Sequence, residues 1–197
     1  MLITLMEDTD GAHSYADSES ANYGEVVRMR SEVTLDELEL RRVLGRFVTG
    51  VTVVTADVVG VPLGLTANSF TSVSMKPPLV LFCVHSSSRA KAGLQQAGGF
   101  AINILGADQE HISRQFARAG ENRFADVPFR PGRTGAPILV GAVAYLECRT
   151  KAEFEGGDHL IVLGEVLEFG ILRDTEPLAF LGGRYGQVRC PAPDDES

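Results

Sequence analysis

The segment from Thr66 to Ser74 (TANSFTSVS) holds the densest group of side chains in the chain that could bind a ligand. Five of its nine residues carry hydroxyl groups, and Asn68 adds an amide. A loop of this composition can direct hydroxyls and backbone N–H groups at an anion or at the polar edge of a heteroaromatic ring. Because Ser and Thr are also common in turns, the same residues fit a solvent-exposed turn.

A second group, His85-Ser86-Ser87-Ser88-Arg89-Ala90-Lys91, joins an apolar run to a predicted helix. Three serines and two cations at a helix N-terminus are typical of a phosphate site. The alternative is that one serine simply caps the helix. The sequence leaves both interpretations open.

Two shorter groups contain glycine. In Gly157-Asp158-His159 an acid precedes an imidazole, which can donate to a developing negative charge or to a substrate amide. Adjacent residues of a strand point to opposite faces, so Asp158 need not contact His159. Gly182-Gly183-Arg184-Tyr185-Gly186 can cover a flat ligand with its arginine and tyrosine. Their structural alternatives are an ordinary histidine and an ordinary C-terminal turn.

The elements that would position these groups follow from hydrophobic periodicity and capping signals. Thr34 and Glu37 fit a capping box for a helix that continues to about Phe47. Ser88 and Asp108 are the expected N-caps of two further helices, 89–97 and 109–119. Gly156-Gly157 predicts a hairpin between the last two strands. The predicted strands are 48–56, 63–66, 79–84, 100–105, 142–151 and 159–169, with loops or turns at 57–62, 67–74 and 121–141.

About six strands and three helices are therefore expected. Several strands follow one another without a crossover helix, which favours a mainly antiparallel sheet with peripheral helices, closed or partly open as a barrel. A parallel nucleotide-binding sheet is disfavoured, because no GxGxxG follows the first strand and no GxxxxGK[ST] is present.

Composition limits the classes of partner. The 197-residue chain has a net charge of −8, of which −5 lies in residues 1–32 and −3 in the last few residues. We read 1–32 as an acidic leader, 33–189 as one domain and 190–197 as a short tail. The domain has no net charge, which argues against nucleic-acid binding. No apolar run approaches the ~20 residues of a membrane span, and the N-terminus is not a secretory signal.

The three cysteines are widely spaced, with no CxxC, and predict neither a disulfide framework nor a zinc site. His13 and His111 have no metal-ligand partner at a suitable spacing. We therefore expect no bound metal and a cytoplasmic location.

Taken in order, these segments resemble the small flavin reductases of two-component flavin-dependent monooxygenases, the FMN-binding split-barrel group. The resemblance runs from about Leu40 to Gln187. Its markers are FVTGVTVVT (47–55), TANSFTSVS (66–74), PPLVLFC (77–83), FAINIL (100–105), Arg123-Phe124, Gly157-Asp158-His159 and Gly183-Arg184-Tyr185-Gly186.

The resemblance implies an antiparallel six-stranded Greek-key split β-barrel, a homodimer, and a flavin near the subunit interface. The residues that would line the flavin ring are Thr66, Ala67, Asn68, Ser69 and Phe70, with Ser72 at the phosphate or ribityl chain. The phosphate end would lie at His85, Ser86, Ser87, Lys91 and Ala92. Other residues implied near the flavin are Phe116, Ala117, Arg123 and Phe124. His159 would face the nicotinamide, and Arg184 with Tyr185 would close over it.

The resemblance implies hydride transfer from NADH to FMN, with FAD and NADPH as alternative cofactors, and delivery of reduced flavin to a separate monooxygenase. Stacking of the two rings at roughly 3–3.5 Å would provide most of the rate, so no nucleophile is needed. We predict that His159 positions the nicotinamide or shapes the negative charge of the reduced flavin. The alternatives are a reductase that keeps its flavin and reduces another acceptor, a non-catalytic flavin- or haem-binding carrier or sensor, and a plain interaction module.

Overall fold

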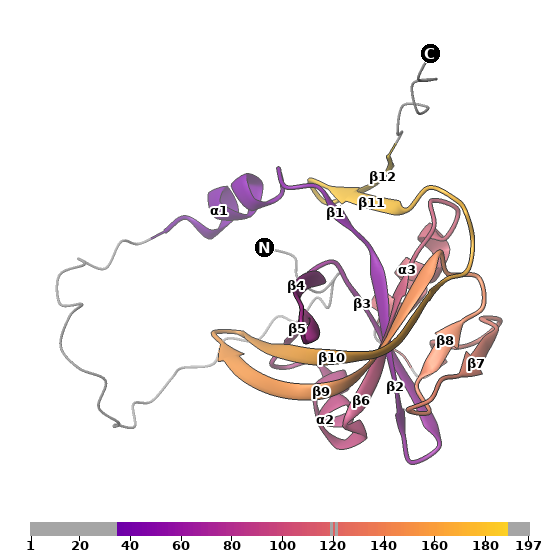
Figure 1. Ribbon diagram of the computed structural model, residues 1–197. Coiled ribbons are helices and arrows are strands. Elements are labelled where there is room, and N and C mark those ends of the chain that lie inside the picture. The colour runs from indigo at the N-terminus through magenta and orange to yellow at the C-terminus, as the bar shows by residue number, and fades with distance from the viewer. Residues whose placement is uncertain (1–34, 119, 121, 189–197) are drawn as a thin grey trace, which may run out of the picture.

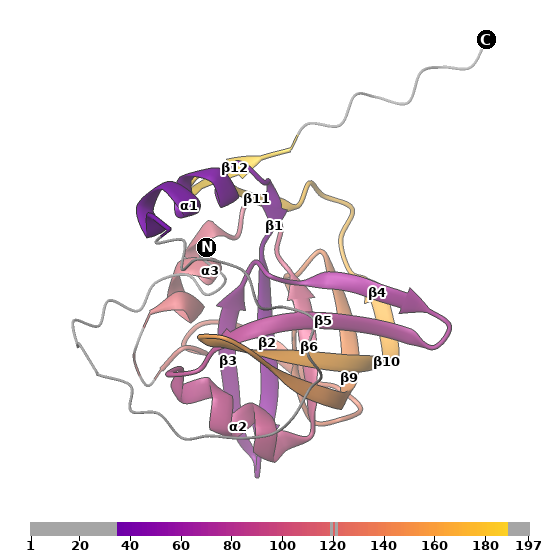
Figure 2. The same cartoon turned by 90° about the vertical axis from the view of Figure 1, so that its left-hand side faces the viewer.

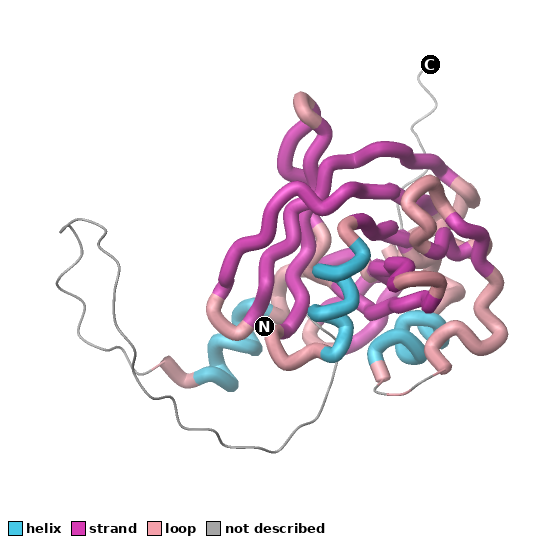
Figure 3. Tube along the Cα trace, turned by 90° about the horizontal axis from the view of Figure 1, so that it is seen from below, coloured by secondary structure: helices cyan, strands magenta, loops and turns pink. Residues whose placement is uncertain are grey.

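The computed structural model describes residues 35–118, 120 and 122–188. The expected leader, the Thr34 cap and the tail at 190–197 lie outside the described residues. Figure 1 shows a large curved sheet, a smaller sheet at its upper edge and a short hairpin beside it. Figure 3, viewed from below, shows the three helical segments standing apart from one another around the strands.

The elements run in the following order. The helices are α1 (Glu37–Leu44), α2 (Arg89–Ala97) and α3 (Glu110–Ala117). The strands are β1 (Thr49–Gly50), β2 (Thr52–Val58), β3 (Val61–Ala67), β4 (Thr71–Met75), β5 (Pro78–His85), β6 (Gly99–Ile104), β7 (Phe129–Pro131), β8 (Pro137–Leu139), β9 (Ala144–Gly156), β10 (His159–Ile171), β11 (Leu178–Leu181) and β12 (Arg184–Gln187).

The prediction of a mainly β, antiparallel protein with peripheral helices is confirmed. The main sheet has the order β3-β2-β6-β9-β10-β5-β4, and every described pairing in it is antiparallel. It has seven strands rather than six, and among the described strands β3 and β4 are unjoined edges. The additional strand is β4, which forms in the hydroxyl-rich segment that was expected to be a turn, because β5 supplies its ladder partners.

Two connections are tighter than the sequence suggested. The expected loop at 57–62 shrinks to Val59 and Gly60, whose φ angles of 54° and 82° match the left-handed conformations of a two-residue hairpin turn. The expected C-terminal turn is also a hairpin, in which Gly182 and Gly183 adopt positive φ between β11 and β12. The predicted β9–β10 hairpin is confirmed.

Of the two predicted helix caps that lie within the described residues, one is confirmed. Ser88 caps α2 as expected, and its hydroxyl accepts from the backbone N–H of Ala90. Asp108 does not cap α3, because both of its carboxylate oxygens accept from the Arg173 guanidinium at 2.9 Å. Asp36 caps α1, and its carboxylate accepts a hydrogen bond from the backbone N–H of Leu38 in the first turn of the helix.

Helices pack on both faces of the main sheet, because successive side chains of β2 point alternately to one face and to the other. Val53 joins a cluster with Phe116 of α3, whereas the next residue, Val54, joins a cluster with Leu94 of α2. In contrast, no residue of α1 is buried within the described part of the chain. None of the described helices is long and apolar enough to cross a membrane.

Candidate functional site

Two imidazoles meet where β5 ends and β10 begins. His159 lies directly opposite His85 in the β5–β10 ladder, and their ring centroids are 5.0 Å apart in an edge-to-face arrangement. Asp158, in the turn before β10, places one carboxylate oxygen 2.7 Å from Nδ1 of His159. This hydrogen bond is the main cause that lowers the pKa of the Asp158 carboxyl. The sequence did not require this contact, and the turn conformation creates it.

The serine-rich segment after β5 has few free backbone donors. The N–H of Ser86 donates to the Asp158 carbonyl, and that of Ser88 to the His85 carbonyl. The N–H of Ser87 donates to Nδ1 of His85 at 3.2 Å. A phosphate in this segment would therefore have to bind through side chains, such as the exposed Ser86 or the half-buried Lys91 on α2, where Ala92 is also exposed.

In the hydroxyl-rich segment, two hydroxyl groups that were predicted to contact a ligand form hydrogen bonds within the chain. The buried Thr66 hydroxyl donates to the Ser113 carbonyl of α3 at 2.6 Å. The Ser69 hydroxyl accepts from the Cys83 N–H at 2.9 Å and fastens the loop to β5. Thr66 and Ser69 thus shape the loop rather than present free hydroxyls.

Asn68 is different. Its amide nitrogen donates to the Thr49 hydroxyl at 3.3 Å, but its carbonyl oxygen is buried and has no hydrogen-bond partner among the described residues. An unpaired buried acceptor is costly, so this atom suits a ligand that carries an N–H donor. Ala67 is fully buried beside it, Phe70 packs on the core, and Ser72 is exposed on the edge strand β4.

Tyr185 on β12 is held against α3. Its hydroxyl lies 2.9 Å from the Ser113 hydroxyl, and the Arg114 guanidinium lies 4.8 Å from the centre of its ring. The neighbouring Arg184 is exposed. Ser113 and Arg114 were not predicted, since a helical serine and arginine carry no local signal that a C-terminal strand will dock on them.

The aromatic residues near α3 form part of the core. Phe116 is 1% exposed, and the Phe124 ring meets it edge-on at 4.9 Å. Arg123 donates to the Gly64 carbonyl at 2.8 Å, which closes the segment over β3. Ala117 is half-buried at the end of α3, where an open depression of about 660 Å³ is lined by residues including His111, Arg114 and Arg123.

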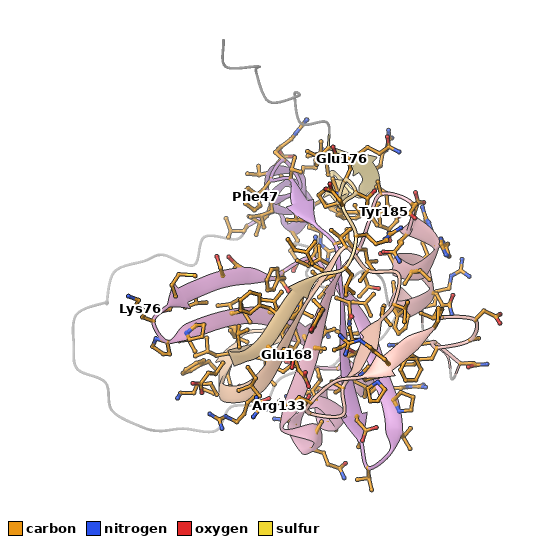
Figure 4. The ribbon with its side chains drawn as sticks, turned by 45° about the vertical axis from the view of Figure 1, so that its right-hand side comes forward. Phe47, Lys76, Arg133, Glu168, Glu176 and Tyr185 are labelled. Atoms are coloured by element: carbon orange, nitrogen blue, oxygen red, sulfur yellow. The ribbon has the colours of Figure 1, made fainter. Side chains whose placement is uncertain are left out.

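The predicted residues lie at separate places in the chain, with the His85–His159 group apart from the residues around α3. The His85–His159 group lies at the β9–β10 turn, on the opposite side of the molecule from α3 in Figure 1. Tyr185 lies with α3, and Figure 4 shows it far from Lys76 at the tip of the β4–β5 hairpin. The 68–70 loop lies between β3 and β4, the two edge strands.

A substitution at Gly64 tests the packing of the α3 group. A Cβ at this position would lie 2.4 Å from Cε1 of Phe116 and 3.2 Å from Cζ of Phe124. We expect Gly64→Ala to lower the free energy of unfolding by about 2 kcal/mol, because the rings must shift in a close-packed core. Urea denaturation measures the change, with Gly50→Ala as control, since a Cβ there meets nothing within 4 Å. Equal stability of the two variants would contradict the packing described.

The sequence matches a known family over most of its length. Residues 44–189 match the model described as "Flavin reductase like domain". A "Probable flavin reductase" of Rhizobium meliloti (strain 1021) is 50% identical over 142 residues, which cover 72% of this chain and 45% of that protein. This chain therefore spans less than half the length of that relative.

Other relatives are matched over most of their length. "FMN reductase (NADH) SmoA" of Agrobacterium fabrum is 45% identical, covering 75% of this chain and 83% of that protein. The "Flavin-dependent monooxygenase, reductase subunit HsaB" of Rhodococcus jostii is 36% identical, covering 81% and 84%.

Among solved structures, the "NADH:FAD oxidoreductase SgcE6" of Streptomyces globisporus, in complex with NAD and FAD fragments, superposes with a TM-score of 0.74. It is 46% identical and covers 82% of this chain and 96% of that one. Sequence, fold and the order of the motifs agree, and the chain belongs to the family of flavin reductase like domains.

Proposed function

We propose that this protein is an NADH-dependent flavin reductase that transfers hydride to FMN or FAD and supplies the reduced flavin to a separate flavin-dependent monooxygenase. The observation that carries this proposal is the match of residues 44–189 to the flavin reductase family. Its relatives support each part: they include an NADH-dependent FMN reductase, an NADH:FAD oxidoreductase and a monooxygenase reductase subunit.

The residues present fit a flavin. The buried carbonyl oxygen of Asn68, which has no partner in the part of the chain that the structure describes, suits the imide N–H at the polar edge of the flavin ring. Thr66 and Ser69 hold the loop that carries Asn68 in place. When bound, the flavin supplies the hydride-accepting chemistry. What this chain contributes is the position of the rings and an environment for negative charge.

The assay that tests the function is NADH oxidation under air, with FMN and then FAD added and with NADPH as the second donor. Turnover that rises with free flavin supports a reductase that releases its product and ranks both cofactors. Tight flavin binding without turnover would contradict the proposal and favour a carrier or sensor. A red rather than yellow protein would indicate haem.

We also propose a homodimer of split barrels of the Greek-key type, in which a second copy completes the site. Two observations support it: the His159 and Tyr185 groups lie apart within one chain, and an apolar surface is left exposed among the described residues. The side chains of Leu38, Val43 and Phe47 are 69%, 60% and 76% exposed in and after α1. Figure 2 shows α1 and the edge strand β4 on the same face of the molecule, turned toward the viewer.

Burial of these side chains in a dimer would remove a large apolar area from water. Analytical ultracentrifugation is expected to show a dimer for the wild-type chain and a shift toward monomer for Phe47→Asp. A monomeric wild type would contradict the shared site.

The free thiols of Cys83 and Cys148 support our expectation of a reducing, cytoplasmic compartment.

A further inference from the structure

One carboxylate lies between the two imidazoles of the β5–β10 pair. Asp158 Oδ1 is 2.7 Å from Nδ1 of His159, and Asp158 Oδ2 is 4.0 Å from Nε2 of His85. The side chain of Asp158 is 78% exposed, whereas that of His159 is only 9% exposed. The carboxylate therefore reaches a nearly buried ring from the solvent side.

The hydrogen bonds determine which nitrogen of each ring carries the proton. A backbone N–H can only donate, so Nδ1 of His85 accepts from Ser87 and the proton of a neutral His85 is on Nε2. An ionised carboxylate can only accept, so Nδ1 of His159 carries its proton toward Asp158. In neutral His159, Nε2 is then an acceptor.

The orientation of His159 is also restricted. Its ring meets the His85 ring at 78° with 5.0 Å between centroids, and the two residues are direct partners across the ladder. The Ser87 hydroxyl lies 2.7 Å from Nδ1 of His85 and holds that ring from its other side. Rotation of His159 would break the Asp158 bond and displace His85.

We propose that Asp158 and His85 are positioning residues that hold His159 in a single tautomer and orientation, so that its Nε2 accepts the carboxamide N–H of the nicotinamide. This inference rests on the proposed function. It moves His85 from the phosphate end of the flavin, where the resemblance placed it, to the nicotinamide end. As an acceptor, Nε2 of His159 favours the carboxamide of a nicotinamide, because an amide N–H can donate to it and an ionised carboxylate cannot.

Kinetics of Asp158 and His85 variants test the proposal. Asp158→Ala is expected to raise the KM for NADH and lower kcat, each about tenfold, with the KM for flavin unchanged. His85→Phe, which keeps an aromatic edge against His159, should retain more activity than His85→Ala. Glu155→Gln is the matched control, because it removes an exposed carboxylate from the same hairpin. Circular dichroism and Tm confirm that each variant is folded.

Nitrogen-15 NMR of the imidazoles gives a readout that does not depend on turnover. The wild type is expected to show His159 protonated at Nδ1 and His85 protonated at Nε2. In Asp158→Ala the His159 signals should move toward a mixture of tautomers. Wild-type signals and wild-type KM in that variant would overturn the proposal. A wild-type protein that shows these tautomers but does not oxidise NADH would instead refute the proposed function, because the positioning would exist without the reaction.

Discussion

Asn103→Ala is expected to lower the free energy of unfolding by about 3 kcal/mol, because a fully buried amide joins three strands. Its nitrogen lies 3.1 Å from both the Val53 carbonyl and the Thr55 hydroxyl, and its oxygen accepts from the Leu139 N–H at 2.8 Å. The side chain is 0% exposed. Alanine would leave the buried Leu139 N–H without a partner and open a cavity between β2, β6 and β8.

Urea denaturation of the apo protein measures this loss, with Asn122→Ala as control because Asn122 is exposed. Thr55→Val removes the neighbouring hydroxyl, which also donates to the Pro137 carbonyl. The two substitutions should be strongly non-additive, since they remove parts of one network. A loss below about 1 kcal/mol in Asn103→Ala would contradict the stabilising role of the amide, and additive losses in the double variant would show that the two groups are not coupled.

His159→Ala is expected to lower kcat for NADH oxidation about 10²-fold at saturating NADH, because misplacement of the nicotinamide by a fraction of a ring width slows hydride transfer. The ring is nearly buried and is held against the His85 ring and the Asp158 carboxylate, so alanine removes a side chain whose position is fixed. Stopped-flow measurement of flavin reduction separates this step from NADH binding.

His111→Ala is the matched control, since His111 lies on the exposed side of α3. It should retain wild-type hydride transfer. An unchanged rate of flavin reduction in His159→Ala at saturating NADH would remove His159 from the catalytic residues. Loss in both variants would indicate a general effect on folding, which the thermal transition of each variant would reveal.

Elements with local signals could be predicted from the sequence alone. Runs of β-branched and apolar residues predicted β2, β5, β6, β9 and β10, and Ser88 marked the start of α2. Because several of the predicted strands follow one another without a crossover helix, the antiparallel class also followed from the sequence. The order of the motifs indicated the flavin reductase family. This inference does not require knowing which residues are in contact.

Which polar groups remain available for a ligand depends on contacts that form when the chain folds. Thr66 and Asn68 belong to the same polar segment, yet Thr66 bonds to α3, whereas no side chain or backbone group of residues 35–118, 120 or 122–188 pairs with the Asn68 carbonyl oxygen. Asp108 is a good cap by sequence, but Arg173, 65 positions away, takes both of its oxygens. Local patterns cannot predict such outcomes, because a distant chain segment competes for the same hydrogen bond. The same holds for Asp158, whose contact with His159 and position near His85 arise only when β5 pairs with β10.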